Sequence, residues 1–437
     1  MEKAFKQLLK LQFPFLCQGK LLLAVSGGVD SVVMTHLCKL AKLDFSIAHC
    51  NFNLRGDESN EDEIFVKELA EELGVEAFTQ SFDTEGFARD AKLSIQMAAR
   101  DLRYSWFEEL RSTRNFDYIL SAHHANDNVE TFLINLVRGT GIEGLTGIKD
   151  TNGYIIRPLL NFTRKEIENY ATSNHLNWRE DSSNASSKYM RNNIRHQVVP
   201  ILEEINPQFI ESFSQSQRFL KESVDLVDDY IALLYKEIVE KTSIGYQLNV
   251  EVLKRIPNNK AVLYQLLKSF GFTEWSDVHA LLQAQSGKMV FSRSYRLIKD
   301  RDHLLLTEIP NKETDKEYEI LTYEDVVMLP IGTFSFHEVS EVKEVDEHHI
   351  FIPKELLKFP LILRKWKHGD HFFPFGMKGK KKLSDYFKDK KLSLPEKENV
   401  WLLCSNNEIV WVVNHRADNR FSVTDASQKI IKITYTP

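Results

Sequence analysis

A short polar segment near the amino-terminal end has the residue types of a phosphate-binding turn. It consists of Ser26, Gly27, Gly28, Val29, Asp30 and Ser31. The apolar run Leu21–Val25 directly precedes it and is typical of a buried parallel strand, and the apolar residues after Ser31 recur at helical spacing. A strand, a glycine turn and a helix in this order direct backbone N–H groups and the positive end of a helix dipole at one point. Because glycines let an anion approach the backbone closely, we expect a phosphate group to bind here.

The same segment differs from the loop of the common nucleotide hydrolases. No lysine follows in the spacing Gly-x-x-x-x-Gly-Lys-Ser/Thr. Asp30 supplies a carboxylate that could hold Mg²⁺. The segment resembles the signature of the PP-loop ATP pyrophosphatases, which cleave ATP between its α and β phosphates, and this resemblance implies that ATP is the ligand. The plainer alternative is a tight turn with a serine as the helix cap.

The elements around this segment predict an α/β fold with a doubly wound parallel sheet. Up to about residue 125, strand-like segments alternate with helix-like segments. We expect strands at 20–25, 45–49, 75–82 and 118–122, and helices at 29–42, 58–73 and 93–111. Ligands of such a sheet lie at the carboxyl ends of its strands. Three of these ends carry polar residues, at 26–31, 49–55 and 123–127, and we expect them to converge on one crevice.

The rest of the chain predicts two further domains, since 437 residues exceed the size of a single core. We expect an ATP-binding catalytic domain at 1–210, a helical middle domain at 211–317 and a small, mostly β domain at 318–437. The strands expected in the last domain are 328–331, 350–352, 360–364, 400–404, 409–413 and 430–434.

The charge is unevenly distributed along the chain. The net charge is −6, but residues 361–437 hold 15 Lys and Arg against 8 Asp and Glu, a balance of +7 that leaves −13 for the first 360 residues. The lysines are densest at 378–391. This asymmetry fits a local binding face for a polyanion, and it fits a solvated surface equally well.

Two further patterns have plainer explanations than the sites they resemble. Residues 139–144 match the dinucleotide pattern Gly-x-Gly-x-x-Gly, but they follow a helix expected at 126–138, so we expect a helix end and a loop. His123 and His124 resemble a metal pair, yet adjacent residues at a strand end point in opposite directions. We expect one of them to be structural and the other to line the pocket.

Later motifs narrow the resemblance, and the chain is similar to the tRNA(Ile)-lysidine synthase family over roughly residues 20–200. The shared motifs are SGGVDS at 26–31, HCNFNLR at 49–55, ARDLRY at 99–104, HHANDNVET at 123–131, RPLL at 157–160, DSSN at 181–184 and RNNIR at 191–195. Residues 369–370, 374–376 and 381–385 resemble the last domain of that family, whereas the middle domain matches only in being helical and in its position.

Two positions depart from the pattern of this family. Where the family commonly has Asp-Asp-Gln, this chain has Asn126-Asp127-Asn128, so one carboxylate of the pair is missing and the Mg²⁺ ligands are left open. Asn414 stands where glycine is usual, and asparagine tolerates left-handed backbone better than most residues.

The resemblance implies a reaction. The family joins the side-chain amine of L-lysine to the wobble cytidine of an isoleucine tRNA with a CAU anticodon, through a cytidine adenylated by ATP, and releases pyrophosphate and AMP. Residues 26–31 would bind ATP, and Asp30 and Asp127 would hold Mg²⁺. Asp127 or Glu130 would accept the proton of the lysine amine, while Arg191 or Arg195 would clamp a phosphate.

Further residues are expected to contact the RNA or to line the site. They are His49, Asn51, Arg55, Arg100, Arg103, His123, Asn192, Lys380, Lys381 and Lys382. The basic cluster at 378–391, with the interleaved Tyr386 and Phe387, is the surface that we expect to hold the tRNA body, since the target base must leave its stack. The alternative is that Asp127 and Glu130 are ordinary carboxylates of a helix start and that the arginines at 100 and 103 are surface charges.

Two other functions stay open as alternatives. A PP-loop tRNA thiolase would need a close cysteine pair, and the four cysteines, at 17, 38, 50 and 404, are widely spaced. A non-catalytic module that binds tRNA or a nucleotide would not need the intact loop with its carboxylates. The cysteine usage and the apolar pattern predict a cytoplasmic protein without a membrane segment, and a homodimer is left open.

Overall fold

The computed structural model describes residues 1–180, 190–310, 316–322, 326–342, 346, 348–377, 379–424, 427 and 429–437. The chain forms two compact units, Met1–Asp228 and Asp229–Pro437, whose boundary falls inside the long helix α11 (Phe209–Ile238). The domain limits expected at 210 and 317 stay predictions. Among the described residues, no helix combines the length and the apolar character needed to cross a membrane.

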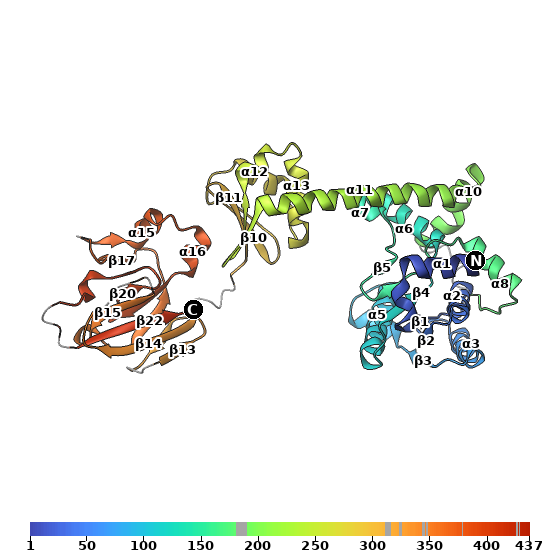
Figure 1. Cartoon of the computed structure of the whole chain (residues 1–437), viewed down its shortest axis with the longest axis horizontal. Coiled ribbons are helices and arrows are strands. Elements are labelled where there is room, and N and C mark those ends of the chain that lie inside the picture. The colour runs from blue at the N-terminus through green and yellow to red at the C-terminus, as the bar shows by residue number, and fades with distance from the viewer. Residues whose placement is uncertain are drawn as a thin grey trace. The chain divides into compact units, whose positions relative to one another are not determined.

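A six-stranded sheet forms the centre of the first unit, in the order β3-β2-β1-β4-β6-β5 (Figure 1). Its strands are β1 (Lys20–Ala24), β2 (Asp44–Asn51), β3 (Ala77–Ser81), β4 (Tyr118–Ser121), β5 (Thr151–Asn152) and β6 (Ile155–Ile156). Neighbouring strands are parallel except for the pair of β5 and β6. Since the strand order reverses beside β1, the carboxyl ends of β1 and β4 form the switch point at which such sheets bind ligands.

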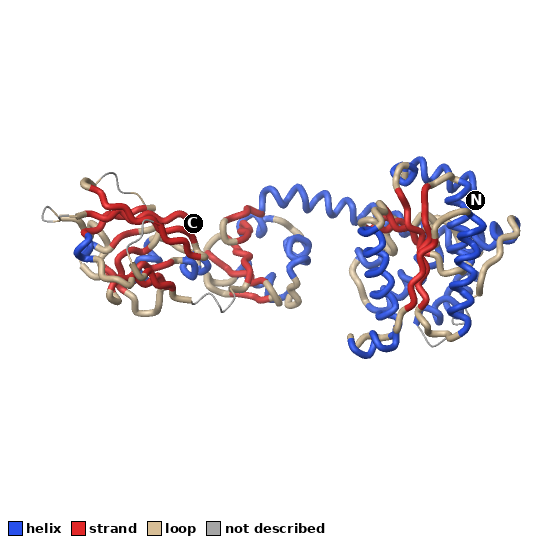
Figure 2. The backbone as a smooth tube through the Cα atoms, turned by 90° about the horizontal axis from the view of Figure 1, so that it is seen from below, coloured by secondary structure: helices blue, strands red, loops and turns tan. Residues whose placement is uncertain are grey.

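Helices cover both faces of this sheet, which Figure 2 shows edge-on. The helices and turns of the first unit are α1 (Glu2–Gln12), η1 (Pro14–Cys17), α2 (Val29–Leu40), α3 (Asp57–Leu73), α4 (Thr84–Asp90), α5 (Ile95–Thr113), α6 (Ala125–Arg138), α7 (Ile142–Leu145), α8 (Arg164–Ser173), α9 (Met190–Asn193), the π-helical turn η3 (Ile194–Val198), α10 (Val199–Ile205) and the first part of α11. Side chains alternate along β1, so Leu21 and Leu23 pack in one core with α2, whereas Leu22 packs in a second core with Phe107 of α5.

The predicted doubly wound α/β fold is therefore confirmed, and the expected strands and helices lie within a few residues of β1 to β4, α2, α3 and α5. The short helix α4 was not predicted. Gly139 ends α6 as its cap at φ 73°, as expected, but the expected loop is shorter than residues 139–144 because residues 142–144 belong to α7.

The beginning of the second unit combines the expected helices with a sheet. The helices and turns are the end of α11, α12 (Val250–Arg255), α13 (Asn259–Leu267), η4 (Lys268–Phe270), α14 (Trp275–Ala280) and η5 (Leu281–Gln283). The strands are β7 (Val239–Thr242), β8 (Gly245–Asn249), β9 (Met289–Phe291), β10 (Tyr295–Asp300) and β11 (His303–Glu308), in the antiparallel order β7-β8-β11-β10-β9. This sheet is not evident from the sequence, because apolar runs as short as those of β10 and β11 do not distinguish strands from helices.

The last part of the chain is mostly β, as predicted. Its strands are β12 (Tyr318–Ile320), β13 (Val326–Leu329), β14 (Gly332–Val339), β15 (His349–Pro353), β16 (Leu361–Lys365), β17 (His371–Phe372), β18 (Lys381–Lys382), β19 (Trp401–Ser405), β20 (Glu408–Val412), β21 (Arg416–Ala417) and β22 (Ile430–Thr436). Its helices and turns are η7 (Lys354–Leu356), α15 (Leu383–Asp389), α16 (Leu394–Asn399) and η8 (Asn419–Phe421).

Two larger sheets share the core of this part, β12-β16-β19-β20-β21 and β13-β14-β22-β15, with Phe334, Trp411 and Ile433 buried in it. The strand expected at 328–331 was placed wrongly at its end, because Pro330 and Ile331 form the turn between β13 and β14. Asn414 has φ 61°, so it adopts the left-handed backbone that its place in the sequence suggested.

Candidate active site

The glycine segment forms the turn between β1 and α2. Gly27 has φ +92°, and Gly28 is the cap of α2 without any side-chain capping hydrogen bond. The Ser31 hydroxyl donates to the carbonyl of Gly28 at 2.8 Å, and the Ser26 hydroxyl accepts from the Gly28 N–H at 3.4 Å. The cap is thus a glycine and not the serine of the plainer alternative. The start of α2 is left as a cradle of backbone N–H groups for an anion.

Two carboxylates and a histidine meet at the ends of β1 and β4. His124 Nε2 lies 3.7 Å from Asp30 Oδ1 and 3.6 Å from Asp127 Oδ2. Asp127 Oδ2 also accepts the N–H of His124 at 3.1 Å, which caps the start of α6. Two of the three strand ends that we expected to converge therefore do so. His123 instead places its Nδ1 3.1 Å from the Ser121 hydroxyl, so His124 is the histidine between the carboxylates.

Asp30 makes one charged contact that the sequence analysis missed. Arg164, the first residue of α8, pairs with Asp30 Oδ2, and its own N–H donates to Asn126 Oδ1 at 2.9 Å. Asn126 thus uses its side chain to hold α8 at the site. The capping box of Thr163 and Glu166 signals the helix start in the sequence, but only the fold brings Arg164 to Asp30.

Glu130 lies at the centre of an arginine cluster. It is 1% exposed, and its carboxylate accepts from Arg195 Nε at 2.6 Å and from Arg195 Nη2 at 3.1 Å. Arg191 Nε lies 3.4 Å from the same carboxylate, and Arg191 also donates to the Thr131 hydroxyl at 2.8 Å. Arg195 belongs to the π-helical turn η3, a rare conformation that often occurs at functional sites.

The protein shifts the pKa values of these acids in opposite directions. Burial and the nearby Asp127 raise the pKa of Glu130, against the lowering effect of Arg195. The pKa of Asp127 is lowered although burial acts to raise it, because His124, His123, a backbone N–H and Arg195 favour its charged form. Burial lowers the pKa of His123 to about 4, so this histidine is neutral at pH 7.

The end of β2 braces the loop through protein contacts. His49 Nδ1 lies 2.9 Å from the carbonyl oxygen of Val25, and Asn51 donates to Asn60 and Glu63 of α3, each at 3.1 Å. A second missed arginine, Arg179, acts from the other side: its N–H donates to the Gly27 carbonyl at 2.9 Å. Arg55 and Arg179 both pair with Asp62 of α3, at 2.7 and 3.1 Å. These side chains hold the glycine turn in shape.

The residues that we expected to contact the RNA differ in their exposure to solvent. Arg100 and Arg103 are exposed on α5, 4.9 Å from the ring of Tyr104 and 5.2 Å from that of Phe52, and Asn192 is half-buried. Lys380 and Lys382 are exposed.

Other residues of the expected RNA surface contact neighbouring side chains of the protein. Lys381 pairs with Asp389 at 2.5 Å. The expectation that Tyr386 and Phe387 belong to this surface is wrong, because both side chains are buried in the hydrophobic core beneath α15 and pack against its other apolar residues. The motif at 181–184 and Lys378 lie outside the described residues.

A metal site made only of protein ligands is not found among the described residues, since no three histidine, cysteine or acidic side chains are grouped to hold an ion. One oxygen is nevertheless suited to a cation. Asp30 Oδ1 is buried and has no hydrogen-bond partner among the described residues. Because Mg²⁺ is usually held by one or two carboxylates together with water and phosphate oxygens, Asp30 and Asp127 fit such an ion in the presence of a nucleotide.

Comparisons with known proteins agree with this geometry. Three family models match: "PP-loop domain" at 1–202, "TilS substrate binding domain" at 241–309 and "TilS substrate C-terminal domain" at 361–433. The chain is 42% identical over 422 residues to the tRNA(Ile)-lysidine synthase of Parabacteroides distasonis, covering 95% of each chain. It is 38% identical over 424 residues to that of Bacteroides thetaiotaomicron, again covering 95% of each, and 36% identical over 422 residues to that of Porphyromonas gingivalis, covering 93% and 92%.

Proposed function

The chain belongs to the tRNA(Ile)-lysidine synthase family, and we propose that it joins L-lysine to the wobble cytidine of an isoleucine tRNA with a CAU anticodon. ATP adenylates the carbonyl oxygen of the base and releases pyrophosphate. The lysine amine then attacks the base carbon that carries the adenylated oxygen, and AMP leaves together with that oxygen. The observation that supports this most strongly is the grouping of Asp30, Asp127 and Glu130 beside the glycine turn at the switch point of the sheet.

The chain's own groups meet the electrostatic demand of the first step. Pyrophosphate leaves only if its negative charge is neutralised. The N–H groups at the start of α2 would neutralise that charge. Arg191 or Arg195 would clamp a phosphate by exchanging its contacts with Glu130 for the phosphate oxygens. We therefore place the leaving pyrophosphate at the glycine turn.

Asp30, through its Oδ1 atom, and Asp127 are the residues that would hold Mg²⁺. When bound, the ion would supply positive charge to the phosphate oxygens. Arg164 would then compete with the ion for Asp30, since it already pairs with the second oxygen of that carboxylate.

Glu130 is the proposed acceptor of the proton that the lysine amine loses before it attacks. An amine has an ordinary pKa of about 10.4, so a carboxylate with a raised pKa is a better acceptor than an ordinary one. Glu130 has this raised pKa, whereas Asp127 has a lowered one and stays charged. The two acids therefore suit different roles, Asp127 as a cation ligand and Glu130 as a base.

The thiolase alternative is not favoured. The four cysteines are free and lie in different elements, and burial raises the pKa of Cys50 to about 12 and that of Cys404 to about 11. Sulfur delivery depends on a reactive thiolate, which such pKa values suppress. The non-catalytic alternative fits less well because the turn and its carboxylates are intact.

A homodimer and a cytoplasmic location also remain proposals. Exposed apolar side chains on the last helices of the first unit, Ile201, Ile205 and Leu226, give a dimer an available surface. Sedimentation velocity of the purified chain would decide the association state, and a monomer at all concentrations would exclude the dimer.

Transfer of labelled L-lysine to a transcript of isoleucine tRNA with a CAU anticodon, in the presence of ATP and Mg²⁺, tests the proposed function. We expect incorporation by the wild-type chain and a loss of at least about 100-fold in Asp30→Ala, because a positioned charge is removed from the phosphate site. A methionine tRNA with the same anticodon is the control substrate. Asp90→Ala, an exposed carboxylate at the end of α4, is the control variant and should keep full activity.

Each other outcome is informative. Release of pyrophosphate without lysine transfer would keep the adenylation and point to another nucleophile. If the wild-type chain released no pyrophosphate but bound the transcript, the non-catalytic module would replace this proposal.

A further inference from the structure

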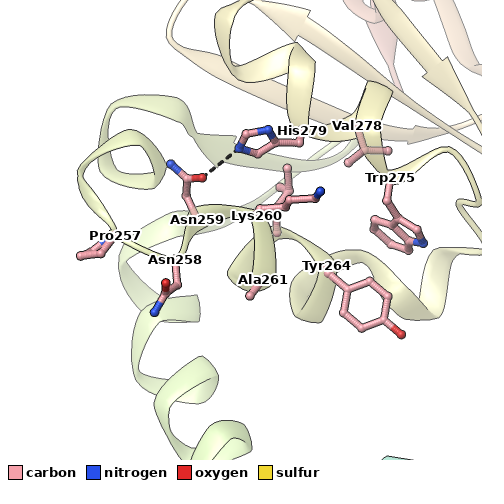
Figure 3. A pocket seen from close by; sticks show the side chains of 10 residues that line it. Pro257, Asn258, Asn259, Lys260, Ala261, Tyr264, Trp275, Val278 and His279 are labelled. Carbon is pink, nitrogen blue, oxygen red and sulfur yellow. Dashed lines mark hydrogen bonds between the residues drawn. The ribbon is translucent and has the colours of Figure 1, made fainter. Parts of the chain in front are cut away.

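A cavity of about 640 Å³ opens on the surface of the middle part of the chain (Figure 3), and none of its lining residues belongs to the carboxylate site described above. It is formed by the first two turns of α13, by one face of α14 and by the segment before α13. Figure 3 shows Tyr264 and Trp275 together at one end and Asn258 and Pro257 at the other.

The two aromatic rings make a rigid apolar end wall. Their centroids lie 4.7 Å apart with an angle of 65° between the ring planes, so the edge of one ring meets the face of the other. Tyr264 is nevertheless 43% exposed. An exposed ring held in place by a second ring offers a flat face on which another planar group can stack.

The polar residues of the cavity favour an anionic occupant. Lys260 is exposed and makes no ion pair or hydrogen bond with the described part of the chain. As the second residue of α13 it lies at the positive end of the helix dipole, where a lysine is unfavourable unless an anion is near. The residues that line the cavity include no carboxylate. His279 Nε2 and Asn259 Oδ1, 2.9 Å apart, fix the wall between α13 and α14.

The cavity thus offers an aromatic ring for stacking, an unpaired lysine and amide groups, and it has no acidic side chain. These features suit one unpaired nucleotide, whose base would stack on the ring and whose phosphate would contact the lysine. We propose that this cavity binds an unpaired nucleotide of the RNA substrate, with Tyr264 and Trp275 as the stacking wall and Lys260 at the phosphate. This inference rests on the proposed function for the identity of the RNA. The family model matched at 241–309 covers the whole cavity and carries the description of a substrate binding domain, which agrees with an RNA contact there.

The test measures the affinity of the full chain for the isoleucine tRNA transcript by filter binding at several salt concentrations. Tyr264→Leu keeps an apolar side chain but removes the ring, and we expect its Kd to rise by roughly 5- to 100-fold. Tyr264→Phe keeps the ring and should bind as the wild type does. Lys260→Ala should reduce the slope of log Kd against log salt by about one.

Phe291→Leu is the matched control. Phe291 is an exposed ring of β9, is 55% exposed and does not line the cavity, so its loss should leave the Kd unchanged. Thermal melting of each variant separates lost affinity from lost folding.

An unchanged Kd in both Tyr264→Leu and Lys260→Ala overturns the inference, and so does an equal loss in Tyr264→Leu and Phe291→Leu. A change in sedimentation with an unchanged Kd would assign the cavity to a second copy of the chain instead. Failure of the proposed function would look different, since the wild-type chain would then bind the transcript without transferring lysine.

Discussion

At the residue scale, the surroundings of two acids on one helix shift their pKa values in opposite directions. Asp127 caps its own helix and faces two histidines, which keeps its pKa low. Glu130, one turn further along α6, is buried beside Arg195, and its pKa is raised. A pair of titratable groups whose environments separate their pKa values is the usual sign of an acid–base division of roles.

Glu130→Gln tests this division, because it preserves the shape of the side chain and removes the base. We expect the lysine-dependent step to slow by about 10²- to 10⁴-fold. Adenylation, measured as pyrophosphate release before lysine is added, should change much less. The opposite pattern, with slow adenylation and normal lysine transfer, would contradict the role of Glu130.

The pH profile gives this prediction a second readout with a definite sign. A base acts only in its deprotonated form, so the rate of the lysine step should fall as the pH drops through the raised pKa of Glu130. Asp127 has a lowered pKa and stays charged over that range. Glu130→Gln should lose this acidic limb, whereas Glu143→Gln, a carboxylate of the nearby helix α7, should retain it.

The residue types of the site could be predicted from the sequence, but several of their partners could not. Asp30, Asp127 and Glu130 stand beside recognisable motifs in the chain. Arg164 lies 134 positions from Asp30, and no local pattern marks this pair. The choice between His123 and His124 likewise depends on how β4 ends and α6 begins, which fixes the direction of each ring.

At the element scale, the turn between β1 and α2 depends on one glycine more than on its neighbour. Gly27 has φ +92°, and an added Cβ would lie 3.4 Å from a ring carbon of Phe65. Gly28 has φ −71°, which any residue adopts, and its added Cβ would meet only the Ser26 hydroxyl at 3.5 Å.

We therefore expect Gly27→Ala to lower the free energy of unfolding by about 1–3 kcal/mol, because an L-residue is strained at this φ. Gly28→Ala should cost less, at most about 1 kcal/mol, because its φ suits any residue and only the weaker capping by alanine is lost. Urea unfolding of both variants measures the difference. Equal stabilities would mean that the turn adjusts its backbone and that its shape does not depend on Gly27.

Elements with long buried runs could be predicted, and elements defined by distant pairing could not. The strand β1 has five residues with three consecutive leucines at its centre, and this apolar run predicted its position from the sequence. The sheet from β7 to β11 forms through pairings between residues up to 60 positions apart, such as Tyr246 with Leu306 and Asn249 with His303. The π-helical turn η3 carries no sequence signal that distinguishes it from an α-helical turn.

At the scale of the whole molecule, the charge asymmetry of the sequence fits both a binding face for a polyanion and an ordinary solvated surface near the end of the chain. The structure shows which lysines of the cluster are exposed and which are already paired. Lys380 and Lys382 are exposed, whereas Lys381 is paired with Asp389 and the aromatic residues beside it are buried. A sequence lists charges but does not tell which of them are already neutralised by a neighbour, so the lysines differ in their capacity to meet a phosphate.

The double variant Lys380→Ala/Lys382→Ala should therefore weaken binding of the tRNA transcript and reduce the salt slope by about two, one for each lost phosphate contact. Lys381→Ala alone should change the slope by less, because its charge is already shared with Asp389. The matched control is Lys354→Ala/Lys429→Ala, which removes two lysines of the same part of the chain that both contact Glu338, at 3.1 and 3.2 Å. If the control reduced the slope as much as the test variant did, the RNA would be responding to the total charge of this region. A slope reduced only by the loss of Lys380 and Lys382 would place the phosphate backbone at the unpaired lysines.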